Sequence, residues 1–561
     1  MSDIRTPSDR VDRTPSDRVD RTPSDSADVC VIGAGPAGAL IAHRLAAAGH
    51  DVVVLEAGPR FDPEDRIEQM DDALRPAHGR PDIWEMGGNR DAFTSSGDRQ
   101  YPLNHARVKG IGGSTLHWQG MVMRLHERDF GVASREGVGA DWPIEYDDLR
   151  PYYAAAEDAL GVAGASDNPF EPPRETPHPM PAFEPSYSDS IFAEACETLG
   201  ITTHSVPNAR NAEPYDDRSA CVGYGTCQPV CPSGAKYDAT SHVEKAEDAG
   251  ARVIDQVPVQ RLEHDDSGEA VTAAVYATPD GETHRQEARE FVIAAGGVET
   301  PRLLLLSESP QYPDGLANSS GAVGRYFHEH LFAGTGGVID RETRQHHVGF
   351  NTTESHQFYD DPATGTESGV PSADAEADDL GAIKLEFFNY AGPSPVDAAL
   401  SDGGWGEDLR ERVADTYGNH LTVGALVEQT PRRENRVTLD RSTTDDHGNP
   451  VPEIHWEIDD RTRRTIERAN EIQEAILADL DAEITWQVGP TETGPAAHHM
   501  GTTRMGTEPG ESVVDDRART HDLRNCWIAG SSVFPTGGAM NPTLTIAALA
   551  LRTAEHVERR L

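Results

Sequence analysis

The sequence predicts an α/β fold in which a dinucleotide-binding sheet is assembled from separated chain segments and a second, antiparallel sheet is inserted. Three observations carry this prediction. An apolar run at 29–32 leads through a glycine-rich turn into an Ala- and Leu-rich helical run at 37–48, which is the order of a nucleotide-binding unit. A buried strand, a glycine turn and a helix recur at 291–307, and a strand, a glycine-rich loop and a helix end the chain at 525–557.

The first glycine turn reads GAGPAG. Gly33 allows the tight turn, Gly35 lets a pyrophosphate approach the backbone, and Gly38 lets the helix pack closely on the strand. The partner run at 52–55 ends in Glu56, which is placed to accept hydrogen bonds from the adenosine ribose. Because a carboxylate there repels a 2′-phosphate, FAD or NAD is favoured over NADP.

The composition is strongly acidic. The 561 residues carry 95 acidic and 49 basic side chains, a formal net charge of −46, and only four of the basic residues are lysines. Such a surface disfavours nucleic acid and anionic membranes as partners. It is typical of proteins from very salty cytoplasm, where a Debye length of about 3 Å at 1 M salt screens the repulsion. We therefore expect a halophilic, salt-dependent protein.

The ends and linkers of the chain hold few apolar patterns. Residues 1–26 contain a tandem RTPSDRVD repeat, which we expect to be disordered. We expect no direct membrane span, because no apolar run approaches about 20 residues. The chain shows neither a hydrophobic signal region nor a twin-arginine pair, so its own sequence favours the cytoplasm.

Further elements follow from periodicity. Helices are expected near 149–160 and 462–480, and strands at 252–262, 271–276, 421–427, 436–439 and 454–458, with the last three in an antiparallel sheet and an acidic loop at 360–380. We expect a nucleotide-binding domain formed by 27–130, 215–330 and 490–561. The substrate-binding domain and connecting segments are expected at 131–214 and 331–489.

Six segments bear on function: GAGPAG, GGSTLHW, AAGGVETPRLLL, VGRYFHEH, HHMGTTRMG and AGSSVFPTGGAMNPTLTIAALALR. In these segments and in their order the chain resembles the glucose-methanol-choline (GMC) flavoprotein oxidoreductases over nearly all of its length after residue 27. One such motif is weak, whereas six in order are specific. The resemblance implies FAD as the cofactor rather than NAD.

The resemblance places a catalytic histidine at His498, in HHMGTTRMG, and a second catalytic residue at Asn541. Oxidation of an alcohol removes a hydride from carbon and a proton from oxygen, which requires a base tuned near neutral pH. Histidine suits this role. The Asn541 amide can hydrogen-bond the substrate oxygen without competing for the proton. His499 is the alternative base, although packing or orientation is the more natural role for it.

GGSTLHW is expected to lie against the flavin. Gly112 and Gly113 let the backbone come close, and Ser114 can hydrogen-bond the cofactor. In sugar-oxidising members of the family, a histidine before tryptophan at this spacing is joined covalently to the flavin, and His117 matches it. Two alternatives stay open for His117, a covalent link or a side chain that only stacks near the ring.

Three cysteines fall within eleven residues, in CVGYGTCQPVCPSGAKYDAT. Thiolates at such spacing in a glycine-rich loop can converge on one inorganic centre. The resemblance to glucose, gluconate and fructose dehydrogenase catalytic subunits implies a three-iron four-sulfur cluster on Cys221, Cys227 and Cys231. The alternatives are a disulfide plus a free thiol, three reduced loop cysteines, or zinc with His242 as a fourth ligand. Cys30, Cys196 and Cys526 lie in apolar settings and are expected in the core.

The family positions also imply the remaining FAD contacts. Backbone or small side-chain contacts are expected from Val259, Ala295, Gly296, Ala529, Gly530 and Thr543. Thr543 is expected near the pyrimidine edge of the flavin, where helix-terminal N–H groups stabilise negative charge.

Together these features predict an FAD-dependent dehydrogenase that oxidises a sugar, polyol or sugar acid and passes electrons through an iron–sulfur cluster. A cluster suits a one-electron relay to an external cytochrome or quinone, and the resemblance implies a small helper subunit. One alternative is an oxygen-using GMC alcohol oxidase without a cluster. The other is a noncatalytic flavin-binding protein that docks to a partner.

Overall fold

The structure, a computed structural model, describes residues 22–24, 26–75, 83–344, 350–374, 379–389 and 405–561. Nearly all of the predicted N-terminal tail, and part of the acidic loop expected at 360–380, lie outside these residues.

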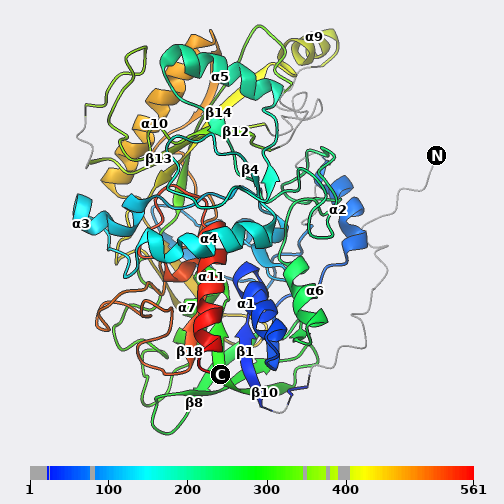
Figure 1. The fold of residues 1–561 in the computed structure, drawn as a ribbon, viewed down its shortest axis with the longest axis vertical. Coiled ribbons are helices and arrows are strands. Elements are labelled where there is room, and N and C mark those ends of the chain that lie inside the picture. The colour runs from blue at the N-terminus through cyan, green and yellow to red at the C-terminus, as the bar shows by residue number, and fades with distance from the viewer. Residues whose placement is uncertain (1–21, 25, 76–82, 345–349, 375–378, 390–404) are drawn as a thin grey trace, which may run out of the picture.

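A seven-stranded sheet forms the lower half of the molecule (Figure 1). Its parallel part has the order β7-β2-β1-β10-β18, and the N-terminal half of the long strand β10 continues into an antiparallel β9 and β8. The strands are β1 (Ala27–Ile32), β2 (Val52–Leu55), β7 (Arg252–Ile254), β8 (Val259–His264), β9 (Val271–Ala277), β10 (Thr283–Ile293) and β18 (Cys526–Ile528). The parallel strands are nearly all buried on both faces, as expected where helices cover a parallel sheet.

Three helices from distant parts of the chain lie side by side in front of this sheet (Figure 1). They are α1 (Pro36–Ala47), α6 (Thr240–Asp248) and α11 (Thr543–Glu558). Helix α1 follows Gly35 with Pro36 in its first turn and buries an Ala- and Leu-rich face. Helix α4 (Tyr146–Leu160) packs on α11, and α7 (Gly296–Leu306) packs on β8.

A six-stranded antiparallel sheet fills the upper half of Figure 1. Its order is β17 (Glu483–Val488), β11 (His330–Val338), β14 (His420–Glu428), β13 (Ile383–Phe387), β12 (Thr353–Ser355) and β6 (His204–Ser205). Helix α10 (Asp460–Asp479) covers one face, together with α5 (Tyr187–Leu199). On that face Phe192 of α5 stacks on Phe387, with ring centroids 4.7 Å apart. The opposite face is turned toward the seven-stranded sheet.

The predicted antiparallel sheet of 421–427, 436–439 and 454–458 is only partly correct. The first run belongs to β14, whereas the other two form β15 (Arg436–Thr444) and β16 (Pro450–Trp456) in a separate three-stranded sheet. There β3 (Thr94–Gly97) pairs with β16 in parallel. A Cβ on Gly97 would lie 2.1 Å from the Trp456 oxygen, so glycine is needed for the approach.

The remaining elements are short. The described chain also contains α2 (Arg66–Ala73), α3 (Val132–Glu136), α9 (Glu407–Thr416), β4 (Ala163–Gly164) and β5 (Met180–Pro181), with 3₁₀ turns at Pro63–Asp65, Leu103–His105, Gly113–Leu116, Glu127–Gly131 and Ser531–Val533. The predicted α/β fold is confirmed, and the helices expected at 149–160 and 462–480 are α4 and α10. Cys30, Cys196 and Cys526 are buried, as expected.

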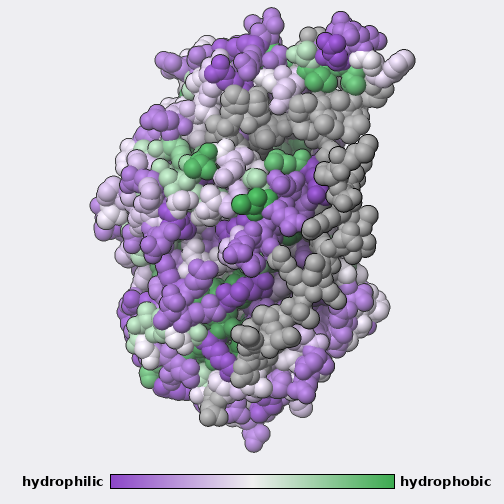
Figure 2. Space-filling view, turned by 90° about the vertical axis from the view of Figure 1, so that its right-hand side faces the viewer, coloured by the Kyte–Doolittle hydropathy of each residue, from purple (hydrophilic) through white to green (hydrophobic). Residues whose placement is uncertain are grey.

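The surface agrees with the acidic composition. Hydrophilic residues dominate the face in Figure 2, and hydrophobic ones occur there in small, separate groups. Among the described helices, none combines the length and the apolar composition that a membrane crossing requires.

Candidate active site

A cavity of about 860 Å³ lies where the two large sheets face each other. Its size is at the upper end of the range for ligand pockets. Fourteen of the residues predicted from the sequence line it: Gly33, Gly35, Glu56, Gly113, Ser114, His117, Val259, Ala295, Gly296, His498, Ala529, Gly530, Asn541 and Thr543. His499 lines it as well, while Gly38 and Gly112 pack behind its wall. The nucleotide motifs and the candidate catalytic residues therefore share one cavity.

The glycine turn forms a cradle at one end of the cavity. Gly33 has φ +104°, and a Cβ there would lie 2.5 Å from the Ala294 oxygen. A Cβ on Gly38 would lie 2.0 Å from the Gly33 oxygen. The first turn of α1 holds no acidic residue, so its free N–H groups and the helix dipole favour an anion. These features fit the pyrophosphate of FAD.

Glu56 lies beside the cradle and is 7% exposed. Its two carboxylate oxygens accept the N–H groups of Ala34, at 2.8 Å, and Gly58, at 2.9 Å. Burial raises the pKa of Glu56, and these N–H groups oppose that shift. Each oxygen keeps a second lone pair, so Glu56 can accept a ribose hydroxyl as well.

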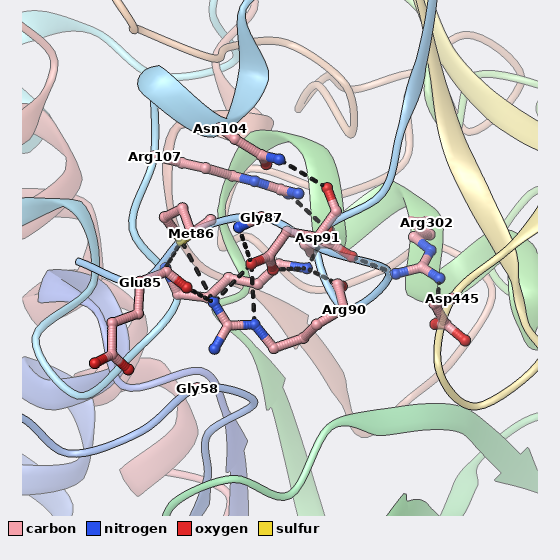
Figure 3. Close-up of polar contacts among 12 residues, drawn as sticks. Gly58, Glu85, Met86, Gly87, Arg90, Asp91, Asn104, Arg107, Arg302 and Asp445 are labelled. Atoms are coloured by element: carbon pink, nitrogen blue, oxygen red, sulfur yellow. Dashed lines mark hydrogen bonds and ion pairs between the residues drawn. The ribbon is translucent and has the colours of Figure 1, made fainter. Parts of the chain in front are cut away.

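A charged cluster forms one wall of the cavity (Figure 3). Its members come from the segments 90–109 and 299–302 and from residue 445. Glu299 is its centre, with oxygens 2.6 Å from Arg107 Nη1, 3.1 Å from Lys109 Nζ and 3.1 Å from Arg302 Nη1. These cations hold the pKa of Glu299 well below its usual range despite burial. The cluster contains the cations Arg90, Arg107, Lys109 and Arg302 against the carboxylates Asp91, Glu299 and Asp445. The wall therefore favours an anion.

Arg107 holds two free donors in this wall. Its Nε and Nη2 are buried, and neither has an acceptor among the described residues. Burial, followed by the charge of Arg107, lowers the pKa of His499 to about 3. A buried guanidinium edge suits bidentate binding of an anionic group, and the FAD-sized cavity beside it points to the cofactor.

Replacing Arg107 by methionine is expected to weaken FAD binding about 10- to 100-fold, because hydrogen bonds to charged groups contribute about 1.5–3 kcal/mol each. The measurement is the flavin content per protein after gel filtration, with the dissociation constant from titration of apoprotein. Arg285→Met, which removes a surface arginine paired with Glu263, is the matched control. Equal flavin content in both variants would contradict a role for Arg107 in cofactor binding.

His498 lies in the loop after β17 and is held by two neighbours. Its N–H donates to Glu329 Oε2 at 2.6 Å, and its Nδ1 lies 2.8 Å from His330 Nδ1. His330 Nε2 lies 3.1 Å from the Gly537 carbonyl, which can only accept, so Nε2 of His330 carries the proton and its Nδ1 is an acceptor. His498 must then donate from Nδ1. Its Nε2 therefore keeps a lone pair, as a general base requires.

The surroundings also keep His498 neutral. Burial, followed by the charges of His330 and Lys384, holds its pKa well below the ordinary value. Burial raises the pKa of Glu329 to about 8, so this carboxyl adds little negative charge at neutral pH. Glu329 also hydrogen-bonds the Tyr101 hydroxyl. His330 and Glu329 belong to VGRYFHEH, a motif for which no residue role was predicted. The available signal was three consecutive polar residues at a position that leads into an apolar strand.

Asn541 lies just before α11, and Lys384 of β13 contacts it. The Lys384 ammonium is 2.5 Å from Asn541 Oδ1. The N-terminus of α11 begins at Thr543, lines the cavity and has no acidic residue in its first turn. Negative charge that develops near Asn541 therefore meets helix N–H groups. Lys384 was not predicted from the sequence.

The loop with Cys221, Cys227 and Cys231 lies against the turn that carries His117. Lys236, which is buried, donates from Nζ to the carbonyls of Trp118, at 2.6 Å, and Cys227, at 2.8 Å. All three cysteines are free thiols. Burial raises the pKa of Cys231, but the N–H and the charge of Lys236 outweigh it and lower the pKa below its ordinary value.

Among the described residues, no group whose ligand atoms lie close enough to hold a single ion contains Cys221, Cys227 or Cys231. Within the described chain, the ligand atoms of His204, Glu354 and His356 are the one trio that lies within 4.8 Å of one another. His242 packs against His43 and its Nδ1 lies 3.0 Å from the Tyr237 hydroxyl. These contacts give His242 a role in packing that requires no metal.

His117 is half-buried at the end of the 3₁₀ turn and lines the cavity. Burial, and then the charge of Lys236, lower its pKa to about 4. The imidazole is therefore neutral at physiological pH. That form suits both a covalent link to the flavin and simple stacking.

Comparison with known proteins agrees with this site. Residues 37–332 and 431–550 match the N- and C-terminal models of the GMC oxidoreductases. The fructose dehydrogenase large subunit of Gluconobacter japonicus is 34% identical, over 95% of this chain and 98% of its own length. The 2-methyl-1,2-propanediol dehydrogenase of Mycolicibacterium austroafricanum is 32% identical, over 95% of both chains. A crystal structure of formate oxidase superposes with a TM-score of 0.67 at 16% identity, covering 96% of this chain and 99% of that one.

The fold and the site together define a flavin-dependent oxidoreductase, and the chain belongs to the GMC oxidoreductase family. Its cofactor is FAD, and it acts as an alcohol or sugar oxidoreductase.

Proposed function

We propose that this enzyme is a dehydrogenase of sugars, polyols or sugar acids that passes electrons from FAD through an iron–sulfur cluster to an external acceptor. The observation that carries the proposal is the His330–His498 pair, which leaves a neutral histidine with a free lone pair in the cavity beside Asn541. The names of the fructose and 2-methyl-1,2-propanediol dehydrogenases support the substrate class.

Each residue has a defined task in the reaction. His498 Nε2 takes the proton of the substrate hydroxyl, and the amide of Asn541 holds the same oxygen as its negative charge develops. FAD, when bound, supplies the acceptor for the hydride that leaves the carbon. The product is the carbonyl compound. His330 and Glu329 fix the ring and the backbone of His498 throughout.

Cys221, Cys227 and Cys231 would hold the iron–sulfur cluster. Lys236 bridges their loop to the turn of His117, which supports a short path from the flavin to the cluster. A cluster supplies one-electron transfer, so a cytochrome or quinone is the acceptor that we propose, with a small helper subunit as the second partner. In this proposal, 27–130, 215–330 and 490–561 form the nucleotide-binding domain, and the substrate-binding domain lies in the remaining segments.

The test is an anaerobic absorption and electron paramagnetic resonance spectrum, in high salt, before and after addition of aldoses and polyols. Bleaching of the flavin together with a three-iron signal would support the dehydrogenase. Because formate oxidase, a protein of similar fold, is named an oxidase, peroxide is measured as well. Peroxide formed in step with substrate loss, in protein without iron, would contradict the relay. Acid precipitation separates covalent from free flavin and so decides between the two alternatives for His117.

The pH dependence follows from the lowered pKa of His498. A base whose pKa lies well below the ordinary histidine value of about 6.5 stays unprotonated as the pH falls to that value. The rate of flavin reduction at low substrate is therefore expected to stay constant from pH 8 to about 6 and to fall only below that. Stopped-flow absorbance between pH 4.5 and 8.5, with circular dichroism to check the fold, measures it. A decline centred at pH 6.5 or above would contradict the neutral-base arrangement.

A further inference from the structure

Strand β13 turns a polar row toward the cavity. Along the sequence IKLEFF, residues alternate between the two faces of the sheet. Leu385 and Phe387 belong to the face covered by α5 and α10, whereas Glu386 and Phe388 line the cavity. The register pairs Glu386 with Glu354 of β12, so these carboxylates share the cavity-facing side with Lys384.

Lys384 is the centre of this row. Its side chain is fully buried, and its ammonium lies 2.7 Å from Glu386 Oε1 and 3.8 Å from Glu354 Oε2. A buried cation is costly unless it is paired, and two carboxylates compensate this one. The chain has only four lysines among its 49 basic residues, and one of them lies here.

The lysine decides which end of the Asn541 amide faces the substrate. An ammonium has only donors, so the Asn541 atom that lies 2.5 Å from it is the oxygen. The two N–H groups of Asn541 then remain for another acceptor. Since Asn541 lines the cavity, these N–H groups can donate to the oxygen of an alcohol bound there.

The same lysine holds Glu386 at the cavity wall. The neighbouring wall residues on this sheet are Phe332, Phe388 and Leu426, which are apolar. Phe332 and Phe388 stack with centroids 5.4 Å apart. Glu386 therefore supplies a carboxylate acceptor within an otherwise apolar surface, next to the amide that binds the reacting oxygen. A second hydroxyl on the substrate can donate to it.

We propose that Lys384 is a positioning residue for Asn541 and that Glu386 binds a second hydroxyl, so that the enzyme prefers substrates with adjacent hydroxyls over monohydric alcohols. This inference rests on the proposed roles of His498 and Asn541. It names a vicinal diol unit as the group that the site recognises.

The experiment compares flavin reduction by 1,2-propanediol and by 1-propanol in Lys384→Met, Glu386→Gln and the control Lys245→Met. Lys245 pairs with Asp216 in another part of the molecule. Lys384→Met is expected to lower the maximal rate for both alcohols about 10- to 100-fold, because hydrogen bonds to charged groups contribute about 1.5–3 kcal/mol. Glu386→Gln is expected to raise KM for the diol about 10-fold and to leave the monohydric alcohol unchanged. The control should match the parent enzyme.

Two further measurements separate positioning from a general loss of structure. In an Asn541→Ala background, Lys384→Met should lower the maximal rate of flavin reduction only slightly further. If the rate losses of the two substitutions multiply instead, the two residues act independently and the inference is overturned. If the single variant does not fold, the double variant Lys384→Met with Glu386→Gln removes the nearer of the two buried carboxylates that the lysine compensates. This double variant should show both the lowered maximal rate of flavin reduction and no preference for the diol over the monohydric alcohol.

Binding of the diol to the oxidised enzyme, followed by the flavin spectrum, tests Glu386 without turnover. Binding that is equally tight in the parent and in Glu386→Gln would overturn the inference. If no alcohol reduces the flavin of the parent enzyme, the proposed function fails. If alcohols reduce it but the Lys384 and Glu386 variants behave as the control, only the inference fails.

Discussion

Replacing His498 by glutamine is expected to slow flavin reduction by substrate about 10²- to 10⁴-fold, the usual contribution of a general base. Glutamine keeps a side chain of similar size that can hydrogen-bond His330, but it has no lone pair basic enough to take the hydroxyl proton. The backbone N–H at this position still donates to Glu329, so the loop should keep its place. Stopped-flow reduction under anaerobic conditions measures the rate directly.

The adjacent His499→Gln variant is the matched control for this experiment. His499 lines the same cavity, but its buried Nε2, 3.7 Å from Glu329, has no hydrogen-bond partner among the described residues, so no neighbour fixes its tautomer as His330 fixes that of His498. We expect less than a 10-fold effect there. If His499→Gln slows flavin reduction strongly and His498→Gln reduces the flavin at a near-normal rate, His499 rather than His498 is the base. His330→Phe should lie between them, because it removes the acceptor that fixes the His498 tautomer.

The second large effect is expected at the cysteines. Cys231→Ser should abolish the three-iron signal and slow reoxidation by a one-electron acceptor at least about 100-fold, while flavin reduction by substrate stays within a factor of about two. The separation is expected because the loop is joined to the His117 turn through Lys236, whereas the proton and the substrate oxygen are handled by His498 and Asn541. The magnitude rests on the cluster being the relay that we propose.

Cys196→Ala serves as the control for that variant, because Cys196 is a buried free thiol in α5. Iron content, acid-labile sulfide and the rates of both half-reactions are measured in each protein. Normal reoxidation in an iron-free Cys231→Ser protein would show that electrons leave from the flavin itself and would return the cysteines to a structural role.

The nucleotide-binding part of this fold could be predicted because its signals are local. GAGPAG must turn a strand into a helix, and Gly33 and Gly38 have no room for a Cβ. The signal at 291–307 is local as well, and this segment forms the end of β10 and α7 in the structure. Helix α5 was missed, although Ser186 and Asp189 form a capping box at its start, because the flanking Pro-rich and acidic residues obscured its apolar period.

The substrate side of the site could not be predicted from periodicity. Strand β13 reads as an ordinary half-buried strand, in which Lys384 and Glu386 would face water. They face the cavity only because the six-stranded sheet turns this side toward the seven-stranded one, and that packing is set by contacts far apart in sequence. His330 was hidden in the same way, since its role depends on Gly537, 207 residues away.

The first and the last strand–helix units of the described chain meet at the cofactor site, and this imposes an order on assembly. Strand β18 completes the sheet beside β10, and α11 packs against α1 while its first residues close the cavity. A growing polypeptide lacks this wall until β18 and α11 have been synthesised. The cofactor site is therefore complete only once the segments far apart in the sequence have come together, and a chain that stops short of Asn541 would lack this wall of the cavity.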